Sequence, residues 1–269
     1  MLPRMSPRFA NRVVWITGAS SGIGESLARA FSAEGAAVIL SARRQQRLQA
    51  LHKALSHPDD ALVLPLDVTD PAAVAQAAEA ALAWRGGVDI LVNNAGISHR
   101  SWIEDTDIET SRRVMEINYF AVVDLTHHIL PSMLARSSGH IVNISSVAGF
   151  VSTPMRAAYA ASKHAVRAYS DALRAEVSRR GVQVTVICPG YIRTDISHSA
   201  LRGDGTPKGE HDQAILSGLD PDIAAQRILT GVHRSRRELY IGGREIWAIY
   251  LQRFFPGIGS LLLPYSAPE

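Results

Sequence analysis

Short continuous runs of apolar residues alternate along this chain with longer stretches in which apolar residues recur every three or four positions. Runs of the first kind are typical of strands buried on both faces, and the second spacing is typical of amphipathic helices. Helices are predicted in segments such as GESLARAFSAEG and PAAVAQAAEAALAWRG. The pattern predicts seven strands, at residues 12–17, 36–41, 61–66, 88–93, 140–145, 182–188 and 238–242.

The alternation of strand and helix predicts the fold class. Repeated strand–helix–strand units form a parallel sheet with helices on both faces, so we expect an α/β fold with one doubly wound, Rossmann-type domain. No repeat or linker divides the chain, and the predicted domain spans residues 1–269 with a core at about 10–243. Residues 191–219 break the alternation with many Gly, Asp and Ser residues. They are predicted to form a mobile insertion that shapes a substrate site.

The last segment, residues 244–269, contains the most apolar stretch of the chain. Gln252, Arg253 and Pro256 interrupt it, so it lacks the roughly 20 unbroken apolar residues of a membrane-spanning helix. Three roles stay open for this tail: covering a substrate cleft, packing against a second subunit, or lying at a membrane interface. The start of the chain, MLPRMSPRFA, has no apolar stretch that would predict a signal peptide or an anchor.

Composition and charge argue against several classes of protein. With 269 residues, 46% hydrophobic and 20% charged, the chain is ordinary globular material. Cys188 is its single cysteine, so no internal disulfide can form and a reducing, cytoplasmic setting is predicted. The net charge is only +3, and the basic residues lie in scattered pairs, so no nucleic-acid partner is predicted. The ten histidines show no metal-ligand spacing, and no metal site is predicted.

A glycine-rich stretch, TGASSGIG, follows the first strand directly and opens the first helix. Gly18, Gly22 and Gly24 allow a tight turn and a close approach of the backbone, which leaves the free N–H groups of a helix N-terminus facing an anion. A pyrophosphate would suit this place. The spacing differs from the common G-x-G-x-x-G fingerprint, so a plain tight turn stays an alternative at this point.

The segment after the second strand bears on the choice of dinucleotide. A site for NAD usually has Asp or Glu about 20 residues beyond the glycines, where the carboxylate binds the ribose 2′-hydroxyl. No acidic residue occurs between Ala36 and Pro58, and Arg43 and Arg44 stand in that place. A guanidinium attracts the 2′-phosphate that a carboxylate would repel, so NADP is predicted, with Arg43 the stronger candidate.

Polar and small residues follow the next strands. Asp67 and Val68 are candidates to contact an adenine ring, whereas Asp70 is predicted to cap the helix that begins at Pro71. The stretch NNAG at residues 93–96 closes the fourth strand, ISSVAG ends the fifth and Pro-Gly ends the sixth. Open α/β sheets bind ligands at the carboxyl ends of their strands, so these stretches are expected around one crevice.

Tyr159 and Lys163 lie four residues apart in the stretch RAAYAASKHAV, on one face of a predicted helix. Alone, they could be a surface pair. However, TGASSGIG, NNAG, Asn118 in EINYF, Ser146 thirteen residues before Tyr159, YAASK and PGYIRT occur together and in this order. This set resembles the short-chain dehydrogenase/reductase family over about residues 10–243, and the text around ISSVAG resembles its 11β-hydroxysteroid-dehydrogenase-like branch.

The resemblance implies a role for each of four residues. Tyr159 would be the general acid/base, with its phenolate stabilised by the ammonium of Lys163 and by the charge of an oxidised nicotinamide. Ser146 would hold the substrate oxygen, while Ser145 would point to the opposite face of its strand. Asn118 would position a water that links Lys163 to solvent.

Further residues are implied as cofactor contacts, among them Thr194 at the nicotinamide carboxamide. The predicted cofactor-binding residues are Gly18, Ser20, Ser21, Gly22, Ile23, Gly24, Arg43, Arg44, Asp67, Val68, Asn94, Ala95, Gly96, Tyr159, Lys163, Pro189, Gly190, Ile192 and Thr194. Cys188 is predicted to be a small core residue because it lies within an apolar run.

The sequence therefore predicts an NADP(H)-dependent oxidoreductase that interconverts a carbonyl and the matching alcohol, with a small-molecule and mostly hydrophobic substrate. A homodimer or homotetramer in the cytoplasm is expected, with contact between the tail and a membrane left open. The alternatives are a non-catalytic NADP-binding sensor, which would not need the Tyr159–Lys163 pair, and a basic nucleic-acid-binding protein.

Overall fold

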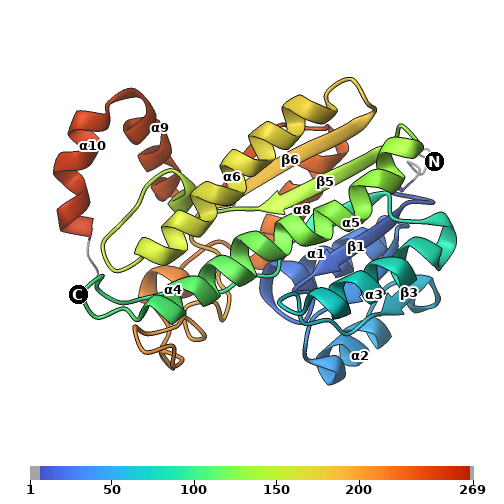
Figure 1. Ribbon diagram of the computed structural model, residues 1–269, viewed down its shortest axis with the longest axis horizontal. Coiled ribbons are helices and arrows are strands. Elements are labelled where there is room, and N and C mark those ends of the chain that lie inside the picture. The colour runs from blue at the N-terminus through green and yellow to red at the C-terminus, as the bar shows by residue number, and fades with distance from the viewer. Residues whose placement is uncertain (1–6, 267–269) are drawn as a thin grey trace, which may run out of the picture.

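The computed structural model describes residues 7–266, apart from the side chains of residues 260, 265 and 266. Seven strands form one parallel sheet in the order β3-β2-β1-β4-β5-β6-β7 (Figure 1). The order reverses between β1 and β4, which makes this the switch point of a doubly wound sheet. The strands are β1 Val13–Thr17, β2 Ala37–Ser41, β3 Ala61–Val63, β4 Ile90–Asn93, β5 Gly139–Ile144, β6 Val182–Pro189 and β7 Glu238–Ile241.

Helices cover both faces of the sheet (Figure 1). One face packs against α1, α2 and α8, and the other against α3, α5 and α6. The α-helices are α1 Gly22–Ala33, α2 Gln45–Lys53, α3 Pro71–Ala83, α4 Ile108–Met115, α5 Ala121–Ala135, α6 Ala157–Val177, α7 Gln213–Leu216, α8 Pro221–His233, α9 Trp247–Phe254 and α10 Pro256–Leu262. A π-helix, Glu116–Phe120, joins α4 to α5.

Alternation along β1 shows how the two cores form. Val14 and Ile16 point into the core beneath α1 and α8, whereas Val13 and Trp15 point into the core beneath α3 and α5. Both faces are apolar because both are covered, which explains the continuous apolar run in the sequence. The predicted α/β fold with seven parallel strands is confirmed.

The third strand is shorter than predicted. Regular pairing ends at Val63, although residues 61–66 were expected to form the strand. The amides of Leu64 and Leu66 still donate to the carbonyl oxygens of Leu40 and Ala42, while Pro65 between them has no amide hydrogen. Proline is tolerated here because β3 lies at the sheet edge.

Residues 191–219 break the alternation of strands and helices as predicted, but they carry defined contacts. Isolated bridges join Ile192 to Leu219 and His99 to Leu201, and the segment contains only the four-residue helix α7. Ile192 and Leu201 are buried. The segment therefore passes across the carboxyl ends of the strands as a packed part of the fold.

Candidate functional site

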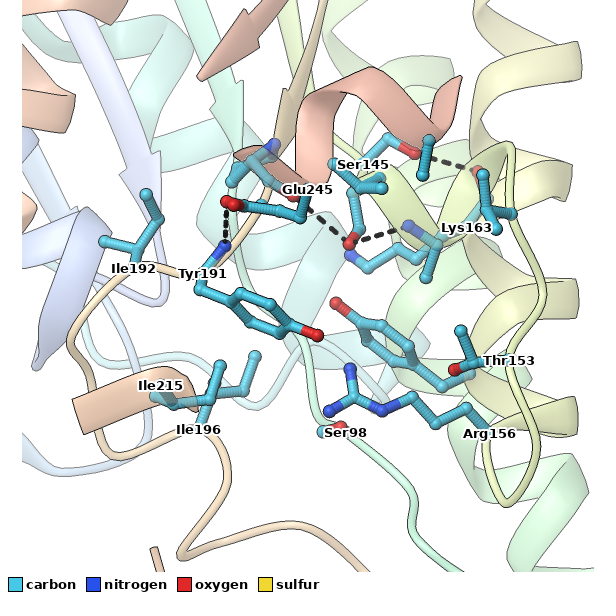
Figure 2. Close-up of a pocket in the computed structure, with 18 of the residues that line it drawn as sticks. Ser98, Ser145, Thr153, Arg156, Lys163, Tyr191, Ile192, Ile196, Ile215 and Glu245 are labelled. Atoms are coloured by element: carbon cyan, nitrogen blue, oxygen red, sulfur yellow. Dashed lines mark hydrogen bonds between the residues drawn. The ribbon is translucent and has the colours of Figure 1, made fainter. Parts of the chain in front are cut away.

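A cavity of about 380 Å³ opens at the carboxyl ends of β4, β5 and β6. It is lined by the residues that follow these strands, by the first turns of α6, by residues 189–197 and by the tail helices. Figure 2 shows polar side chains reaching it from several elements, including Lys163 of α6 and Tyr191 after β6. The predicted crevice thus exists, and ten of the predicted site residues line it, namely Ile23, Asn94, Gly96, Ser146, Tyr159, Lys163, Pro189, Gly190, Ile192 and Thr194.

The glycine-rich turn between β1 and α1 needs its glycines. Gly18 and Gly22 have φ angles of +66° and +56°, which favour a residue without a side chain. A Cβ placed on Gly24 would lie 2.4 Å from the carbonyl oxygen of Gly18. Ser21 precedes α1 without capping it through its side chain, so the first amides of this helix are available to an anion. This cradle fits the pyrophosphate of a dinucleotide.

Asn94 ties the turn to the end of β4. Its side-chain amide donates to the carbonyl oxygens of Thr17 at 2.9 Å and Gly18 at 3.3 Å. The hydroxyl of Thr17 accepts from the amides of Asn94 and Ala95. Gly96 follows, and a Cβ placed there would lie 3.1 Å from Oδ1 of Asn118. These hydrogen bonds fix the stretch NNAG in place between the glycine-rich turn and α6.

Two arginines follow β2, and only one turns towards the glycine-rich turn. Arg44 donates from Nη2 to the hydroxyls of Ser20 and Ser21, both at 2.9 Å. Arg43 is exposed and lies near Asp67, where its charge helps to lower the pKa of that carboxyl. Arg44 was the weaker candidate in the sequence, and the structure places it closer to the phosphate cradle.

Asp67 is engaged locally. Its carboxylate accepts hydrogen bonds from the amide and hydroxyl of Thr69, at 3.0 and 2.8 Å. Burial raises the pKa of Asp67, but these hydrogen bonds and the charge of Arg43 outweigh it, so the pKa is lowered overall. Val68 is half-buried beside it. Asp70 caps α3 as predicted, accepting from the amides of Ala72 and Ala73.

Asn118 lies buried in the π-helix, with 1% of its surface exposed. Its amide nitrogen donates to the carbonyl oxygen of Ile97 at 3.0 Å and to the hydroxyl of Ser162 at 2.9 Å. Its Oδ1 accepts from the amide of Ile97 at 2.8 Å. Ser162 in turn donates to the carbonyl oxygen of Tyr159. The side chain of Asn118 thus joins the loop after β4 to α6, and both of its amide hydrogens are used.

The two serines that follow β5 point in different directions. Ser146 donates to the carbonyl oxygen of Pro189 at 3.3 Å and accepts from the amide of Ala148, and its hydroxyl acts to lower the pKa of Tyr159. Ser145 is buried and donates to the carbonyl oxygen of Lys163. The predicted assignment of opposite faces is consistent with these contacts, since Ser145 supports α6 from below.

Tyr159 and Lys163 both line the cavity and both are almost fully buried. Burial raises the pKa of Tyr159, against smaller opposing effects of Ser146 and Arg156. Burial also lowers the pKa of Lys163, to about 8. Nζ of Lys163 lies 5.8 Å from the centre of the Tyr159 ring and donates to the carbonyl oxygen of Ile144 at 2.9 Å. Desolvation therefore dominates the pKa of Tyr159 in this arrangement, and stabilisation of its phenolate by Lys163 and an oxidised nicotinamide stays a prediction.

The segment after β6 closes the far side of the cavity. Pro189, Gly190, Ile192 and Thr194 all line it, as predicted. Thr194 packs against the glycine-rich turn, because a Cβ on Gly22 would lie 2.9 Å from its methyl group. This contact brings the two ends of the predicted cofactor site together.

Comparison with known proteins identifies the family. The family model described as short chain dehydrogenase matches residues 12–204. The chain belongs to the short-chain dehydrogenase family. It is 44% identical over 263 residues to Dehydrogenase/reductase SDR family member 7B of Danio rerio, covering 95% of this chain and 85% of the relative. It is also 44% identical over 253 residues to Dehydrogenase/reductase SDR family protein 7-like of Drosophila melanogaster, covering 92% of this chain and 78% of the relative.

Solved structures support the assignment of this chain to the short-chain dehydrogenase family. A short-chain dehydrogenase from Streptomyces avermitilis superposes with a TM-score of 0.81 at 33% identity, over 93% of this chain and 96% of that one. A serine dehydrogenase complexed with NADP+ gives a TM-score of 0.78 at 31% identity, over 86% and 94%. A short-chain dehydrogenase/reductase from Burkholderia phymatum, in complex with NAD, gives 0.82 at 25% identity, over 97% and 99%. A nicotinamide dinucleotide is thus the cofactor class of this oxidoreductase family.

Several residues of this short-chain dehydrogenase line the cavity without having been predicted. Glu245, in a short 3₁₀ turn Arg244–Ile246, accepts hydrogen bonds from the amides of Tyr191 and Gly243, at 2.8 and 2.9 Å. Arg156 lines the cavity from the start of α6. Neither residue stands in a recognisable motif. The only signal for Arg156 was its position three residues before Tyr159, whereas Glu245 is near the Pro-Gly turn in the fold alone.

The tail of the short-chain dehydrogenase forms α9 and α10, which pack against each other at one end of the molecule (Figure 1). Ala248, Leu251, Leu262 and Leu263 line the cavity. The outer side carries exposed large apolar side chains, namely Trp247, Tyr250, Phe254, Phe255, Ile258 and Leu261. Of the three roles left open for the tail, the structure supports a part in enclosing the cavity. The last three residues of the predicted tail, 267–269, lie outside the described residues.

The remaining predictions concern membrane, metal and thiol chemistry. Within residues 7–266, no helix combines the length and apolar character needed to cross a bilayer. The described side chains also contain no cluster of His, Cys, Asp and Glu suited to a metal ion. Cys188 is fully buried, as predicted for a core residue. The prediction that no signal peptide or anchor begins the chain rests on residues 1–10, of which residues 1–6 lie outside the described part.

Proposed function

We propose that this chain is an NADP(H)-dependent oxidoreductase that interconverts a ketone or aldehyde and the corresponding alcohol. The observation that carries the proposal is the meeting of Ser146, Tyr159 and Lys163 in one cavity. The phosphate cradle at the start of α1 lies beside it, linked through Thr194. A bound nicotinamide would supply or accept the hydride at the substrate carbon.

The residues of the chain perform the proton chemistry. Tyr159 gives its phenolic proton to the substrate oxygen during reduction and takes it back during oxidation. Ser146, which lines the cavity together with Tyr159, holds the same oxygen as its negative charge develops. The raised pKa means that Tyr159 is protonated at neutral pH, the form in which it acts as the acid in carbonyl reduction.

Lys163 and Asn118 support this unit. The ammonium of Lys163, with a pKa of about 8, is an internal proton donor one helical turn from Tyr159. Asn118 holds α6 through Ser162, which bonds the backbone of Tyr159. Both amide hydrogens of Asn118 are already donated to protein groups, so Asn118 cannot donate a hydrogen bond to a water. A water at this place would be held by an oxygen atom that accepts its hydrogen or by Lys163.

The choice of NADP(H) rests on charge at the end of β2. Arg43 and Arg44 are exposed near the phosphate cradle, and no acidic residue replaces them between Ala36 and Pro58. We assign Arg44 the main contact to the 2′-phosphate because its guanidinium already lies on Ser20 and Ser21. Arg43, near Asp67, is a second contact at the adenosine end.

Substitution of the tyrosine tests the reaction. In Tyr159→Phe the exchangeable proton is lost, so turnover of carbonyl compounds should fall to background while NADPH, followed by its fluorescence, still binds. Tyr250→Phe makes the same chemical change at an exposed ring on α9 and should leave the rate unchanged. Turnover of Tyr159→Phe near the wild-type rate would refute the mechanism. A wild-type protein that binds NADPH and reduces no carbonyl would instead be the sensor.

A separate experiment tests the cofactor assignment. Arg43→Ala and Arg44→Ala should weaken NADPH binding and leave NADH binding nearly unchanged. A lost charge-assisted contact of about 1.5–3 kcal/mol corresponds to a drop of roughly 10- to 150-fold. Equal losses for NADPH and NADH would show that neither arginine contacts the 2′-phosphate.

The apolar outer side of α9 and α10 bears on assembly and location. A homodimer or homotetramer in the cytoplasm would bury these side chains, and a lipid interface would bury them too. We propose the homo-oligomer as the state in solution. Light scattering should then give a mass of two or four chains, and Phe254→Ser with Leu261→Ser should lower it. A wild-type monomer that sediments with lipid vesicles would favour the membrane contact.

A further inference from the structure

Four charged side chains meet beside the proposed active site. Asp212, just before α7, accepts from Nη2 of Arg100 at 2.7 Å and from Nη2 of Arg156 at 3.4 Å. Lys208 donates to its other carboxylate oxygen. Each of these side chains has between 12% and 19% of its surface exposed. The cluster joins the loop after β4, the start of α6 and the segment 191–219.

The cluster carries more positive than negative charge. Two guanidinium groups and one ammonium share a single carboxylate, which leaves a formal charge of +2 in a mostly desolvated place. Burying a charge without a partner is costly, so excess cations of this kind are usually matched by an anion. Among the described residues, Arg100, Arg156 and Lys208 form ion pairs with Asp212 and with no other carboxylate.

Arg156 turns this excess charge towards the cavity. It is the member of the cluster that lines the cavity, and Figure 2 shows its guanidinium pointing inwards beside Ser98. The 3.4 Å contact with Asp212 is the only hydrogen bond of this side chain among the described residues. A guanidinium has five N–H donors, so most of those on Arg156 stay available. The hydroxyls of Ser98 and Thr153 line the cavity on either side.

Backbone geometry holds Arg156 in this position. Met155, directly before it, has a φ of +62°, which is uncommon for a residue with a side chain. The carbonyl oxygen of Met155 accepts from the amide of Ser101, and this bond fixes the unusual turn. Strain of this kind is found where a side chain must face a site.

The place of Arg156 relative to Tyr159 sets the geometry of a ligand. Arg156 is the N-cap residue of α6, Tyr159 is the third residue of the helix, and both line the cavity. Glu245, the acidic residue of the cavity, lies at the other end beside Gly190 and Tyr191 (Figure 2). Ile196 and Ile215, with the inner residues of α9 and α10, form an apolar wall. One ligand could therefore meet a cation, an acid/base group and an apolar surface together.

We propose that the substrate of this oxidoreductase carries an anionic group, a carboxylate or a phosphate, a few bonds from its carbonyl, and an apolar chain beyond it. Arg156 binds the anion, with Ser98 and Thr153 as additional donors, and the tail helices cover the apolar chain. The inference rests on the proposed function, since it names the substrate class of the same cavity. It assigns Arg156 as the residue that determines specificity.

Matched substrates test this assignment. A long-chain ketone with a nearby carboxylate is compared with its methyl ester, and one with a nearby phosphate monoester is compared with the free hydroxyl compound. Wild-type kcat/KM should favour the charged member of at least one pair by roughly 10- to 150-fold. The pair with the larger preference distinguishes carboxylate from phosphate.

Variants separate binding from folding. Arg156→Gln should lower kcat/KM for the charged ketone by roughly 10- to 150-fold more than for the neutral one, so that the preference for the charged ketone is lost. Arg179→Gln removes the same charge at an exposed site beyond the far end of α6 and should change neither value. Equal rates of wild type on both members of each pair, or an equal loss on both in Arg156→Gln, would overturn the proposal. Were Arg156→Gln not to fold, the wild-type ratio alone would decide it.

A binding measurement separates this proposal from the proposed reaction. Calorimetry with an alkyl phosphate, an alkyl carboxylate and the matching alcohol needs no turnover. Binding of an anion but not of the alcohol, with no ketone reduced, would refute the reaction and keep the anion site. Reduction of neutral ketones without anion binding would refute the anion site and keep the reaction.

Discussion

The buried ammonium of Lys163 should control how the stability of the protein changes with pH. Its pKa is about 8 in the fold and 10.5 as an exposed reference. Between these values the unfolded chain holds more protons than the folded one, so the free energy of unfolding rises as the pH rises. Integrated from pH 7 to pH 9, the two pKa values give a gain of about 1 kcal/mol.

Comparison with Lys163→Met isolates this effect. Methionine fills similar space without a titrating group, so the other ionisable residues contribute equally to both proteins. Urea unfolding, followed by tryptophan fluorescence with Trp15 fully buried, gives the free energy at each pH. Wild type should gain about 1 kcal/mol relative to the variant between pH 7 and pH 9. Parallel pH profiles for the two proteins would refute the reasoning, because Lys163 would then titrate alike in both states.

Three further substitutions have defined outcomes. Asp70→Ala removes the cap of α3 and should lower the free energy of unfolding by about 1 kcal/mol, without changing turnover. Gly24→Ala places a methyl group 2.4 Å from the oxygen of Gly18, so calorimetry should show lost dinucleotide binding together with a destabilisation of about 1–3 kcal/mol. Asn118→Leu leaves both backbone groups of Ile97 without their partner and should cost at least about 2 kcal/mol in urea unfolding. Unchanged unfolding curves would contradict each of these three expectations.

The sheet was predictable because a strand that is buried on both faces appears in the sequence as a nearly continuous apolar run. The run Val13–Thr17 is buried at all five positions, and its first four residues are apolar. The edge strand β3 has only one neighbour, β2, so its regular part is short and its end was misplaced.

The centre of the site was predictable for a similar reason. Residues that end parallel strands converge at one edge, so the relative places of NNAG, Ser146 and the Pro-Gly turn follow from order alone. The arginines after β2 were harder. Both side chains are long and exposed, and whether Arg43 or Arg44 turns to the cradle depends on rotamers and on the direction in which α2 begins.

The cavity walls could not be predicted from the sequence. Arg156 and Asp212 are 56 residues apart, and their contact exists only because segment 191–219 folds back over α6. The pKa of Tyr159 likewise depends on burial by several elements, while a helical spacing shows only that Lys163 is near. Such properties arise from tertiary packing and leave no periodic signal.

The π-helix around Asn118 links the length of the chain to the orientation of the site. α4, the π-helix and α5 form one continuous helical segment, and a helix turns by about 100° for each residue. Deleting one residue from Glu116–Phe120 would restore regular α-helical winding and rotate α4 by that angle relative to α5. Asn118 could then no longer face both Ile97 and Ser162. This segment therefore tolerates substitution at its exposed positions far better than any insertion or deletion.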